Sequence, residues 1–232
     1  NDRIIGGVDK TSTRKAIEFY SKFVKGGLFG TNSRTAEMCK LVENSSRDSQ
    51  IAFANELSLI CHKADIDVWE LISLANKHPR VNILNPGCGV GGHCIAVDPY
   101  FLLTDFPKET QIIGKAREIN NYKTLWCIER IISTKKDFEL NNGRKPITAI
   151  CGLAFKPNID DLRESPALEI SLSLINNSLT DENLYVEPNI SSHPKLKLTN
   201  LDEAMIKSDI IVFLVAHKEF TNLKLDTNKI IL

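Results

Sequence analysis

Apolar residues in the first two thirds of the chain recur mainly at helical spacing. The pattern predicts a short strand over 3–9 and a helix over 12–24, which Gly26, Gly27 and Gly30 terminate. Longer helical stretches are predicted over 35–61, 68–76 and 105–136. The intervening segment 79–99 holds three prolines and four glycines, so we predict a loop there.

The last third has strand-like runs that alternate with helical ones. The polar run 139–146 is the predicted linker, and a domain boundary is placed there. Strands are predicted over 147–153, 184–186, 210–215 and 229–232, and helices are predicted to begin at Ser165-Pro166 and at Leu201. This alternation predicts a doubly wound α/β domain with a parallel sheet.

Composition and charge exclude several classes of protein. The 232 residues include 29 basic and 29 acidic side chains, so the formal net charge is zero and nothing indicates a nucleic-acid partner. The longest strongly apolar run, 210–216, is far shorter than the roughly 20 residues that span a bilayer, so no membrane partner is expected. The first residues show neither an initiator Met nor a signal peptide, and we expect the chain to begin within a longer protein.

The six cysteines are scattered and form no Cys-x-x-Cys pair, which indicates reduced thiols in a cytoplasmic protein. A zinc site built from Cys61-His62 and His93-Cys94 is an alternative. Structural zinc sites, however, use closely spaced ligand pairs rather than adjacent residues. No metal site is therefore predicted.

The segment 85–99, with the sequence Asn-Pro-Gly-Cys-Gly-Val-Gly-Gly-His-Cys-Ile-Ala-Val-Asp-Pro, is the richest in candidate chemistry. Its glycines let the backbone approach a ligand closely and deliver Cys94 at the end of the turn. His93 and Asp98 are titratable neighbours, an arrangement that suits a nucleophilic cysteine. The alternative is a glycine-rich turn with a structural cysteine.

The part of this segment from Gly89 to Pro99 resembles the nucleophile loop of the UDP-glucose/GDP-mannose dehydrogenase family. Its His-Cys-Ile-Ala-Val-Asp-Pro form is most similar to members that act on UDP-N-acetyl-D-mannosamine. UDP-glucose members tend to carry Pro-Lys-Asp where this chain has Ala-Val-Asp, and UDP-N-acetylglucosamine members usually have proline at Ala96. The resemblance implies that Cys94 is the nucleophile and that Gly91 contacts substrate.

The segment from Thr35 to Asn44 resembles the central helix of the same family. A helix places Lys40, Asn44 and Arg47 on one face, because they are spaced at i, i+4 and i+7. Without the resemblance this face would be read as a solvated one. With it, Lys40 is a proton donor and acceptor, Asn44 acts in catalysis and substrate binding, Arg47 holds substrate, and Asp98 orients Lys40 as a further catalytic residue.

The segment from Gly152 to Pro166 resembles the family's loop for the UDP portion of substrate. A turn between a strand and a helix N-terminus favours anions, and Lys156 adds a positive charge suited to a diphosphate. The resemblance implies that Phe155 and Lys156 contact substrate and that Arg163 reaches the cofactor. The alternative is a surface turn whose ion pairs contribute little.

Residues 77–81 resemble the family segment that enters the neighbouring subunit's site. The resemblance therefore implies a homodimer or higher homo-oligomer in which His78 and Arg80 bind substrate in trans.

The resemblance also implies the reaction and its cofactor, NAD. A UDP-sugar C6 alcohol would be oxidised to the acid in two hydride transfers, through a thiohemiacetal and a thioester on Cys94, for surface polysaccharide precursors. No Gly-x-Gly-x-x-Gly follows a predicted strand, and residues 2–9 resemble the last strand of the family's dinucleotide-binding domain.

The expected fold class is α/β, in three parts. Residues 1–33 would be a remnant of the dinucleotide-binding domain, 34–140 an all-helical central dimerisation domain, and 141–232 a Rossmann-like doubly wound UDP-binding domain. There are two alternative functions. One is a UDP-N-acetylglucosamine 6-dehydrogenase, and the other is a non-catalytic, dimerising fragment that binds a UDP-sugar.

Overall fold

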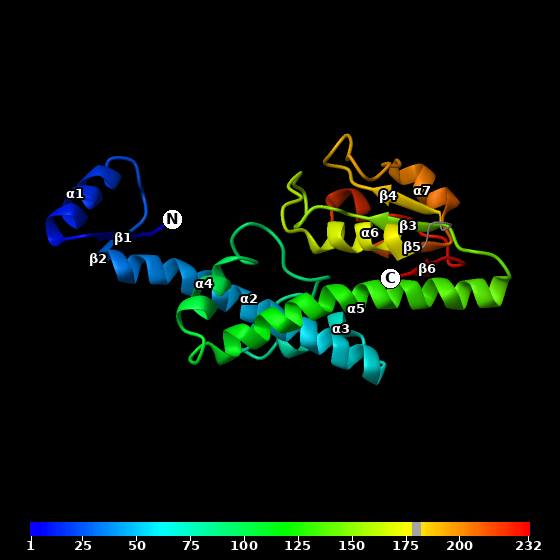
Figure 1. The fold of residues 1–232 in the computed structure, drawn as a ribbon, viewed down its shortest axis with the longest axis horizontal. Coiled ribbons are helices and arrows are strands. Elements are labelled where there is room, and N and C mark those ends of the chain that lie inside the picture. The colour runs from blue at the N-terminus through cyan, green and yellow to red at the C-terminus, as the bar shows by residue number, and fades with distance from the viewer. Residues whose placement is uncertain (178–181) are drawn as a thin grey trace.

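The computed structural model describes residues 1–177 and 182–232, and it shows three parts that follow one another along a long axis (Figure 1). A small β-α-β unit lies at the N-terminal end, crossing helices form the middle, and a parallel sheet with its helices lies at the other end. The segment between α3 and α4, which contains Cys94, runs through the region where the middle part meets the sheet.

The N-terminal unit is a parallel strand pair with one helix. Its elements are β1 (Arg3–Gly7), α1 (Lys10–Tyr20) and β2 (Leu28–Asn32). Asp9 caps α1 by accepting a hydrogen bond from the Ser12 amide at 2.6 Å. Helix α1 ends at Tyr20, before the predicted end at 24, and Gly30, expected to help end this helix, lies within β2. A Cβ there would lie 3.0 Å from Ile17 Cδ1, so the glycine lets α1 pack closely on the strand.

The middle part consists of helices, as predicted. They are α2 (Ser33–Ala64), α3 (Val68–Ala75), α4 (Asp98–Asp105) and α5 (Gln111–Asn142). The two 32-residue helices, α2 and α5, cross and pack against each other (Figure 1). Asn32 caps the start of α2 by accepting from the Thr35 amide at 2.9 Å.

Several boundaries in this part differ from the predicted ones. The helix expected to begin at 105 begins at Gln111, because α4 ends at Asp105 and a turn follows. Asp98 and Pro99, expected in the loop, form the first turn of α4. Proline is tolerated there because backbone N–H groups in the first turn of a helix have no intrahelical acceptor, so its missing N–H costs no hydrogen bond. The first four residues of the predicted linker, 139–142, are helical, since α5 continues until Gly143 takes the left-handed conformation with φ of 65°. Only the remainder of the 139–146 run is a connecting loop.

The C-terminal part is the predicted doubly wound domain. Its elements are β3 (Thr148–Cys151), α6 (Pro166–Asn177), β4 (Asn183–Val186), α7 (Leu201–Lys207), β5 (Ile210–Phe213), a 3₁₀ turn (Lys218–Phe220) and β6 (Ile230–Ile231). All four strands are parallel, in the order β4-β3-β5-β6. The Rossmann-like class expected from the sequence is confirmed.

Two apolar layers hold this sheet. On one face Ile150 and Ile210 pack with Ile170 of α6 and with Ile131 of α5, so the long helix serves both the middle part and the sheet. On the other face the strands pack against α7, around the fully buried Ala204. Each fully buried isoleucine of these layers stabilises the fold by about 1.5–3 kcal/mol relative to an exposed one.

Several expected absences concern only the residues that the structure describes. Among them, no helix is long and apolar enough to cross a membrane. All six cysteines are free thiols. Cys61, His62, His93 and Cys94 do not gather into the alternative zinc site, and residues 1–177 and 182–232 contain no group of three or more potential metal ligands.

Candidate functional site

The turn that follows β3 lies where the chain reverses its direction across the sheet. From β3 the chain passes to β4 on one side and then to β5 on the other, so the carboxyl end of β3 is the topological switch point. Open parallel sheets bind ligands in the crevice at this point. Gly152 begins the turn with φ of 93°, and its Cβ would lie only 2.6 Å from Val215 Cβ, so no side chain fits there.

The glycine-rich loop before Cys94 docks directly on this turn. The Gly92 amide donates to the Arg163 carbonyl at 3.1 Å. A Cβ on Gly91 would lie 2.4 Å from the Glu164 carbonyl oxygen and 2.8 Å from Phe155 Cβ. The glycines therefore allow two backbone segments to touch, and they bring Cys94 to the segment that contains Phe155 and Lys156.

Cys94 is half-buried at the start of α4. Its carbonyl oxygen accepts from the Val97 amide at 3.0 Å and from the Asp98 amide at 2.8 Å. Asn44, which is buried on α2, donates to the Asp98 carboxylate at 2.5 Å, and Lys40 donates to Asn44 Oδ1 at 3.3 Å. Asp98 thus reaches Lys40 through Asn44. Side-chain hydrogen bonds join three of the four residues predicted to be catalytic, and Cys94 is tied to Asp98 through its backbone carbonyl.

Three predicted substrate-binding residues lie apart from this group. Arg47 is exposed, about one turn beyond Asn44 on α2. His78 and Arg80 are exposed in the turn after α3, where the Arg80 amide donates to His78 Nδ1 at 3.3 Å. Within the described part of this chain, none of the three side chains forms a hydrogen bond or ion pair with the Cys94 group.

Arg163, predicted to reach the cofactor, already has a carboxylate partner. Its guanidinium forms an ion pair with Asp161 at 2.6 Å, and both residues lie on the turn beside the Cys94 loop. Hydrogen bonds from Arg163 lower the pKa of Asp161 to about 2, and His93 adds a smaller electrostatic effect in the same direction. The pair therefore stays charged throughout the ordinary pH range. It places the Arg163 charge close enough to Cys94 for the two groups to interact electrostatically.

The first amides of the turn are occupied rather than free for a phosphate. The Leu153 and Ala154 amides donate to Glu187 Oε2 at 2.7 Å and 3.0 Å, and Ser165 Oγ accepts from the Leu168 amide at 3.3 Å at the start of α6. These three amides are therefore not free donors, and the expectation that the turn binds an anion stays a prediction. The exposed Lys156, whose Nζ lies 5.6 Å from the Phe155 ring centroid, remains as the positive group.

The turn after β3 is hydrogen-bonded to a buried pair of residues, Glu187 and His217, that the sequence analysis did not identify. Glu187 and His217 are fully buried, and His217 Nε2 lies 3.1 Å from Glu187 Oε2. His217 Nδ1 accepts from the Asn158 amide at 2.9 Å, which leaves the ring proton on Nε2 for Glu187. The signal available was position, since each residue follows an apolar strand at its carboxyl end.

Comparison with known proteins places this geometry among related structures. Residues 34–122 match the model of the UDP-glucose/GDP-mannose dehydrogenase family, central domain, and residues 149–231 match the UDP binding domain of that family. The UDP-N-acetyl-D-mannosamine dehydrogenase of Campylobacter jejuni is 52% identical over 97% of this chain and 56% of its own length. The NDP-N-acetyl-D-galactosaminuronic acid dehydrogenase of Ralstonia solanacearum is 48% identical over 99% of this chain and 53% of its own length.

A solved structure agrees with these relatives. The UDP-D-ManNAc dehydrogenase of Pyrococcus horikoshii superposes with a TM-score of 0.85 at 39% identity, over 97% of this chain and 52% of that one. The chain thus spans about half the length of the relatives that it matches.

Proposed function

The chain belongs to the UDP-glucose/GDP-mannose dehydrogenase family, and we propose that it takes part in the NAD-dependent oxidation of UDP-N-acetyl-D-mannosamine to UDP-N-acetyl-D-mannosaminuronate. The observation that carries this proposal is the docking of the Cys94 loop on the Phe155–Lys156 turn, with Lys40, Asn44 and Asp98 behind it. A nucleophile, a proton-transfer group and a nucleotide-binding turn then face one substrate.

In this proposal Cys94 forms a covalent bond with the C6 aldehyde of the sugar. The thiolate sulfur adds to the carbonyl carbon, and the carbonyl oxygen takes a proton from the Lys40 ammonium group to give a thiohemiacetal. Asn44 holds the Lys40 amine through its Oδ1 and is itself fixed by Asp98. In the final step water attacks the thioester carbonyl, which releases the acid and returns the thiolate.

NAD would accept the two hydrides of this four-electron oxidation. Among the described residues, β1, α1 and β2 include no Gly-x-Gly-x-x-Gly turn, and Arg163 forms an ion pair with Asp161. The role of Arg163 toward the cofactor stays a prediction. So does the assignment of residues 1–33 to a dinucleotide-binding domain, 34–140 to a central domain and 141–232 to a UDP-binding domain.

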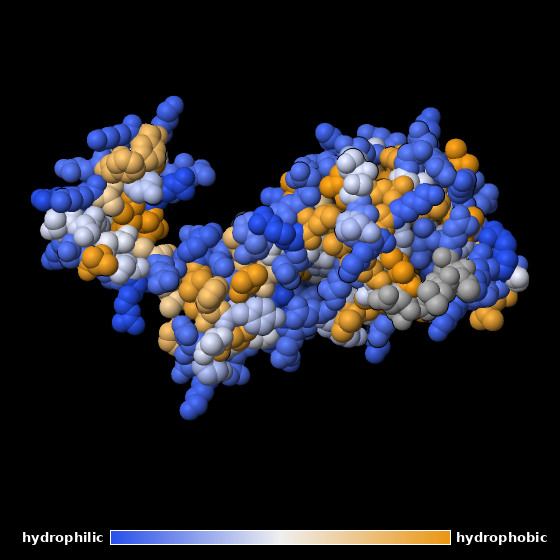
Figure 2. All heavy atoms as spheres, turned by 45° about the horizontal axis from the view of Figure 1, so that its top comes forward, coloured by the Kyte–Doolittle hydropathy of each residue, from blue (hydrophilic) through white to orange (hydrophobic). Residues whose placement is uncertain are grey.

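We further propose that the active form is at least a homodimer, joined through the helical part. Large apolar side chains are exposed on its helices, including Phe53 at 51%, Trp69 at 57% and Leu125 at 53%, and Figure 2 shows apolar side chains on the surface of this part. His78 and Arg80, whose side chains form no hydrogen bond with the Cys94 group of the described chain, would then complete the site of a partner. Free thiols fit a cytoplasmic location for this biosynthetic step.

Incubation of the chain with NAD and UDP-N-acetyl-D-mannosamine tests the function. The proposal expects NADH absorbance together with the uronate, and Cys94→Ser should bind substrate yet form no acid. UDP-N-acetylglucosamine, run in parallel, tests the alternative sugar. Binding of the UDP-sugar without any NADH would instead support the alternative of a non-catalytic dimerising module, whereas acid formation by Cys94→Ser would refute the thioester chemistry.

A further inference from the structure

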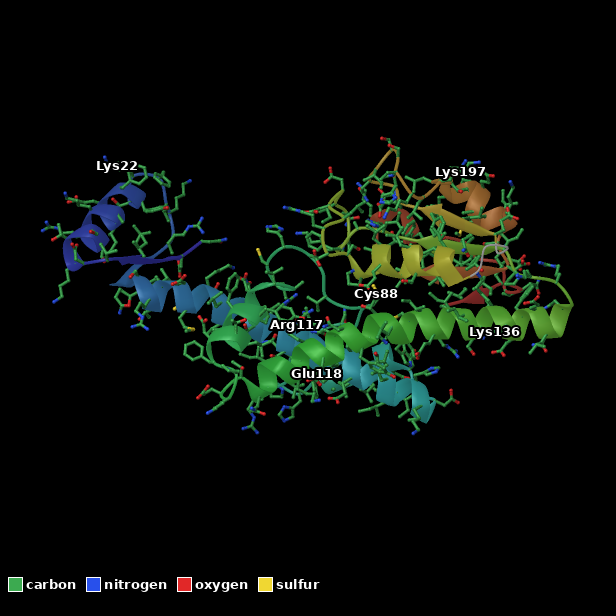
Figure 3. All side chains as sticks on the ribbon, in the orientation of Figure 1. Lys22, Cys88, Arg117, Glu118, Lys136 and Lys197 are labelled. Carbon is green, nitrogen blue, oxygen red and sulfur yellow. The ribbon has the colours of Figure 1, made fainter. Side chains whose placement is uncertain are left out.

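The loop that carries Cys94 has no regular secondary structure over residues 84–93, so something else must fix its path. Two hydrogen bonds tie its start to the crossing of α2 and α5. The Gly87 amide donates to Asn55 Oδ1 at 2.9 Å, and Thr124 Oγ donates to the Cys88 carbonyl at 2.9 Å. Figure 3 shows Cys88 in the region where the loop meets α5 and α6.

Asn55 is the end of a buried chain of polar groups. Its Nδ2 donates to Asn120 Oδ1 at 2.9 Å, and Asn120 Nδ2 donates to Asp48 Oδ1 at 2.8 Å. Arg117, labelled on α5 in Figure 3, donates to the same Asp48 oxygen at 2.7 Å. The exposed fractions are 0% for Asp48 and Asn55, 1% for Asn120 and 5% for Arg117, so water does not compete for these bonds.

The chain has a fixed direction because an ionised carboxylate only accepts hydrogen bonds. Asp48 therefore requires Asn120 to present its Nδ2, which turns Asn120 Oδ1 toward Asn55. Asn55 must then present its own Nδ2 to Asn120, which leaves Asn55 Oδ1 facing the Gly87 amide. An inverted Asn55 amide would instead place two donors against each other at the loop.

The same ion pair reaches the far side of the loop. Arg117 Nη2 donates to Asn121 Oδ1 at 2.8 Å, and Asn121 Nδ2 donates to Tyr100 Oη at 3.3 Å on α4. The Arg117 guanidinium also lies 5.6 Å from the Tyr100 ring centroid. Cys94 thus lies between two points, Gly87 and Tyr100, that are both tied to Asp48 and Arg117.

We propose that Asp48, Asn120 and Asn55 are positioning residues for the Cys94 loop. Asp48 and Asn120 fix the orientation of the Asn55 side-chain amide, whose oxygen accepts from the Gly87 backbone amide and so holds the loop. This inference rests on the proposed function for its catalytic meaning, but its structural content holds for the chain without turnover. Burial raises the pKa of Asp48 above the ordinary value of 3.8, and the Arg117 charge opposes that shift.

The test measures the Gly87 amide in the full 232-residue chain. Labelling the 12 glycines with ¹⁵N gives a small set of amide signals, in which Gly87→Ala identifies the Gly87 peak. Asn120→Leu keeps the side-chain size and does not touch the loop. We expect it to shift the Gly87 signal upfield and to speed its hydrogen exchange about fivefold or more, the effect of losing roughly 1 kcal/mol of hydrogen bonding.

Matched variants separate positioning from general loss of stability. Ser58→Ala removes the buried 2.8 Å bond that Lys123 donates to Ser58 and the 2.6 Å bond that Ser58 donates to the Asn55 backbone carbonyl. Neither bond involves the Asn55 side-chain amide, so the variant should leave the Gly87 signal in place. Asn55→Ala should match Asn120→Leu, and combining the two should add nothing further. Iodoacetamide labelling of Cys94, followed by mass spectrometry, should change severalfold in Asn120→Leu and Asn55→Ala but not in Ser58→Ala.

An unchanged Gly87 signal in Asn120→Leu would overturn the proposal, as would equal effects of Ser58→Ala and Asn120→Leu. If Asn120→Leu does not fold, Asn55→Ala alone decides, since it removes the acceptor at the loop itself. These readouts do not depend on NADH formation, so an inactive chain leaves the positioning proposal open to confirmation or refutation on its own.

Discussion

Substitution of Gly91 by alanine should push the Cys94 loop away from the turn that contains Phe155 and Lys156. A methyl group at this position would lie 2.4 Å from the Glu164 carbonyl oxygen, 2.8 Å from Phe155 Cβ and 2.8 Å from Pro166 Cδ. Ordinary carbon contacts are about 3.5–4.0 Å, so the loop and the turn would have to part by roughly 1 Å. Because two of these atoms belong to backbone or to a proline ring, no side chain can rotate away to make room.

The magnitude follows from that contact. Overpacking of this kind costs about 1–3 kcal/mol, and each 1.4 kcal/mol is about a factor of ten in an equilibrium. If the docked loop is the state that binds nucleotide, the dissociation constant for UDP should rise at least fivefold. The melting temperature of a chain of this size should fall by about 2–4 °C for each kcal/mol that is lost from overall stability.

Calorimetric titration with UDP, together with thermal unfolding, measures both effects. Gly87→Ala is the matched control, because its Cβ would meet only the Gly89 carbonyl oxygen, at 3.9 Å, within the same loop. It should bind UDP like the unsubstituted chain. Equal UDP affinity in Gly91→Ala and Gly87→Ala would refute the idea that docking of the loop on the turn builds the nucleotide site.

Three further substitutions test separate parts of the site. Burial acts to raise the pKa of Glu187, but hydrogen bonds from Leu153 and Asn189 outweigh it and hold this pKa below the ordinary value of 4.5. The ionised carboxylate therefore stabilises the fold above pH 4.5, and this stabilisation is lost as the pH falls through the lower pKa of the folded state. Glu187→Gln should therefore lower the free energy of unfolding in denaturant by about 1–3 kcal/mol at neutral pH. On acidification the free energy of unfolding should fall less in this variant than in the unsubstituted chain. Lys156→Ala should weaken UDP binding about three- to tenfold at low ionic strength and less at high salt; a salt-independent loss would contradict a charge contact with the diphosphate. Arg80→Ala and Cys94→Ser should each abolish acid formation. If Arg80 acts in trans, dimers re-formed from an equal mixture of the two variants should have about a quarter of their sites active. No recovery in the mixture would place Arg80 in the site of its own chain.

The parallel sheet could be predicted because its strands are buried on both faces. Residues such as Ile150, Ile210 and Ile211 are fully buried, and a central strand of this kind reads as a continuous apolar run. The start of α6 was equally legible, since Ser165 caps the helix and Pro166 fits its first turn. Local chemistry decides both features, so no knowledge of distant contacts was needed.

The features that escaped prediction depend on contacts between distant segments. Gly30 lies in a strand because α1 packs over it, and the packing partner cannot be read from the neighbouring residues. The role of Gly91 is similar, since its spacing suits a ligand cradle as well as a contact with Glu164. Glu187 occupies the amides of a turn more than 30 residues before it, so only the folded sheet shows that these donors are already used.

Helix α5 gives the site a mechanical property. Its first half packs on α2, its second half lies under α6 and the sheet, and its 32 residues extend for about 48 Å as one rod. A bend of about 5° at its midpoint would swing the far end by roughly 2 Å, about twice the separation of loop and turn that Gly91→Ala would require. The stiffness of this rod therefore affects how accurately the Cys94 loop, which Thr124 of α5 holds at Cys88, stays aligned with the turn after β3.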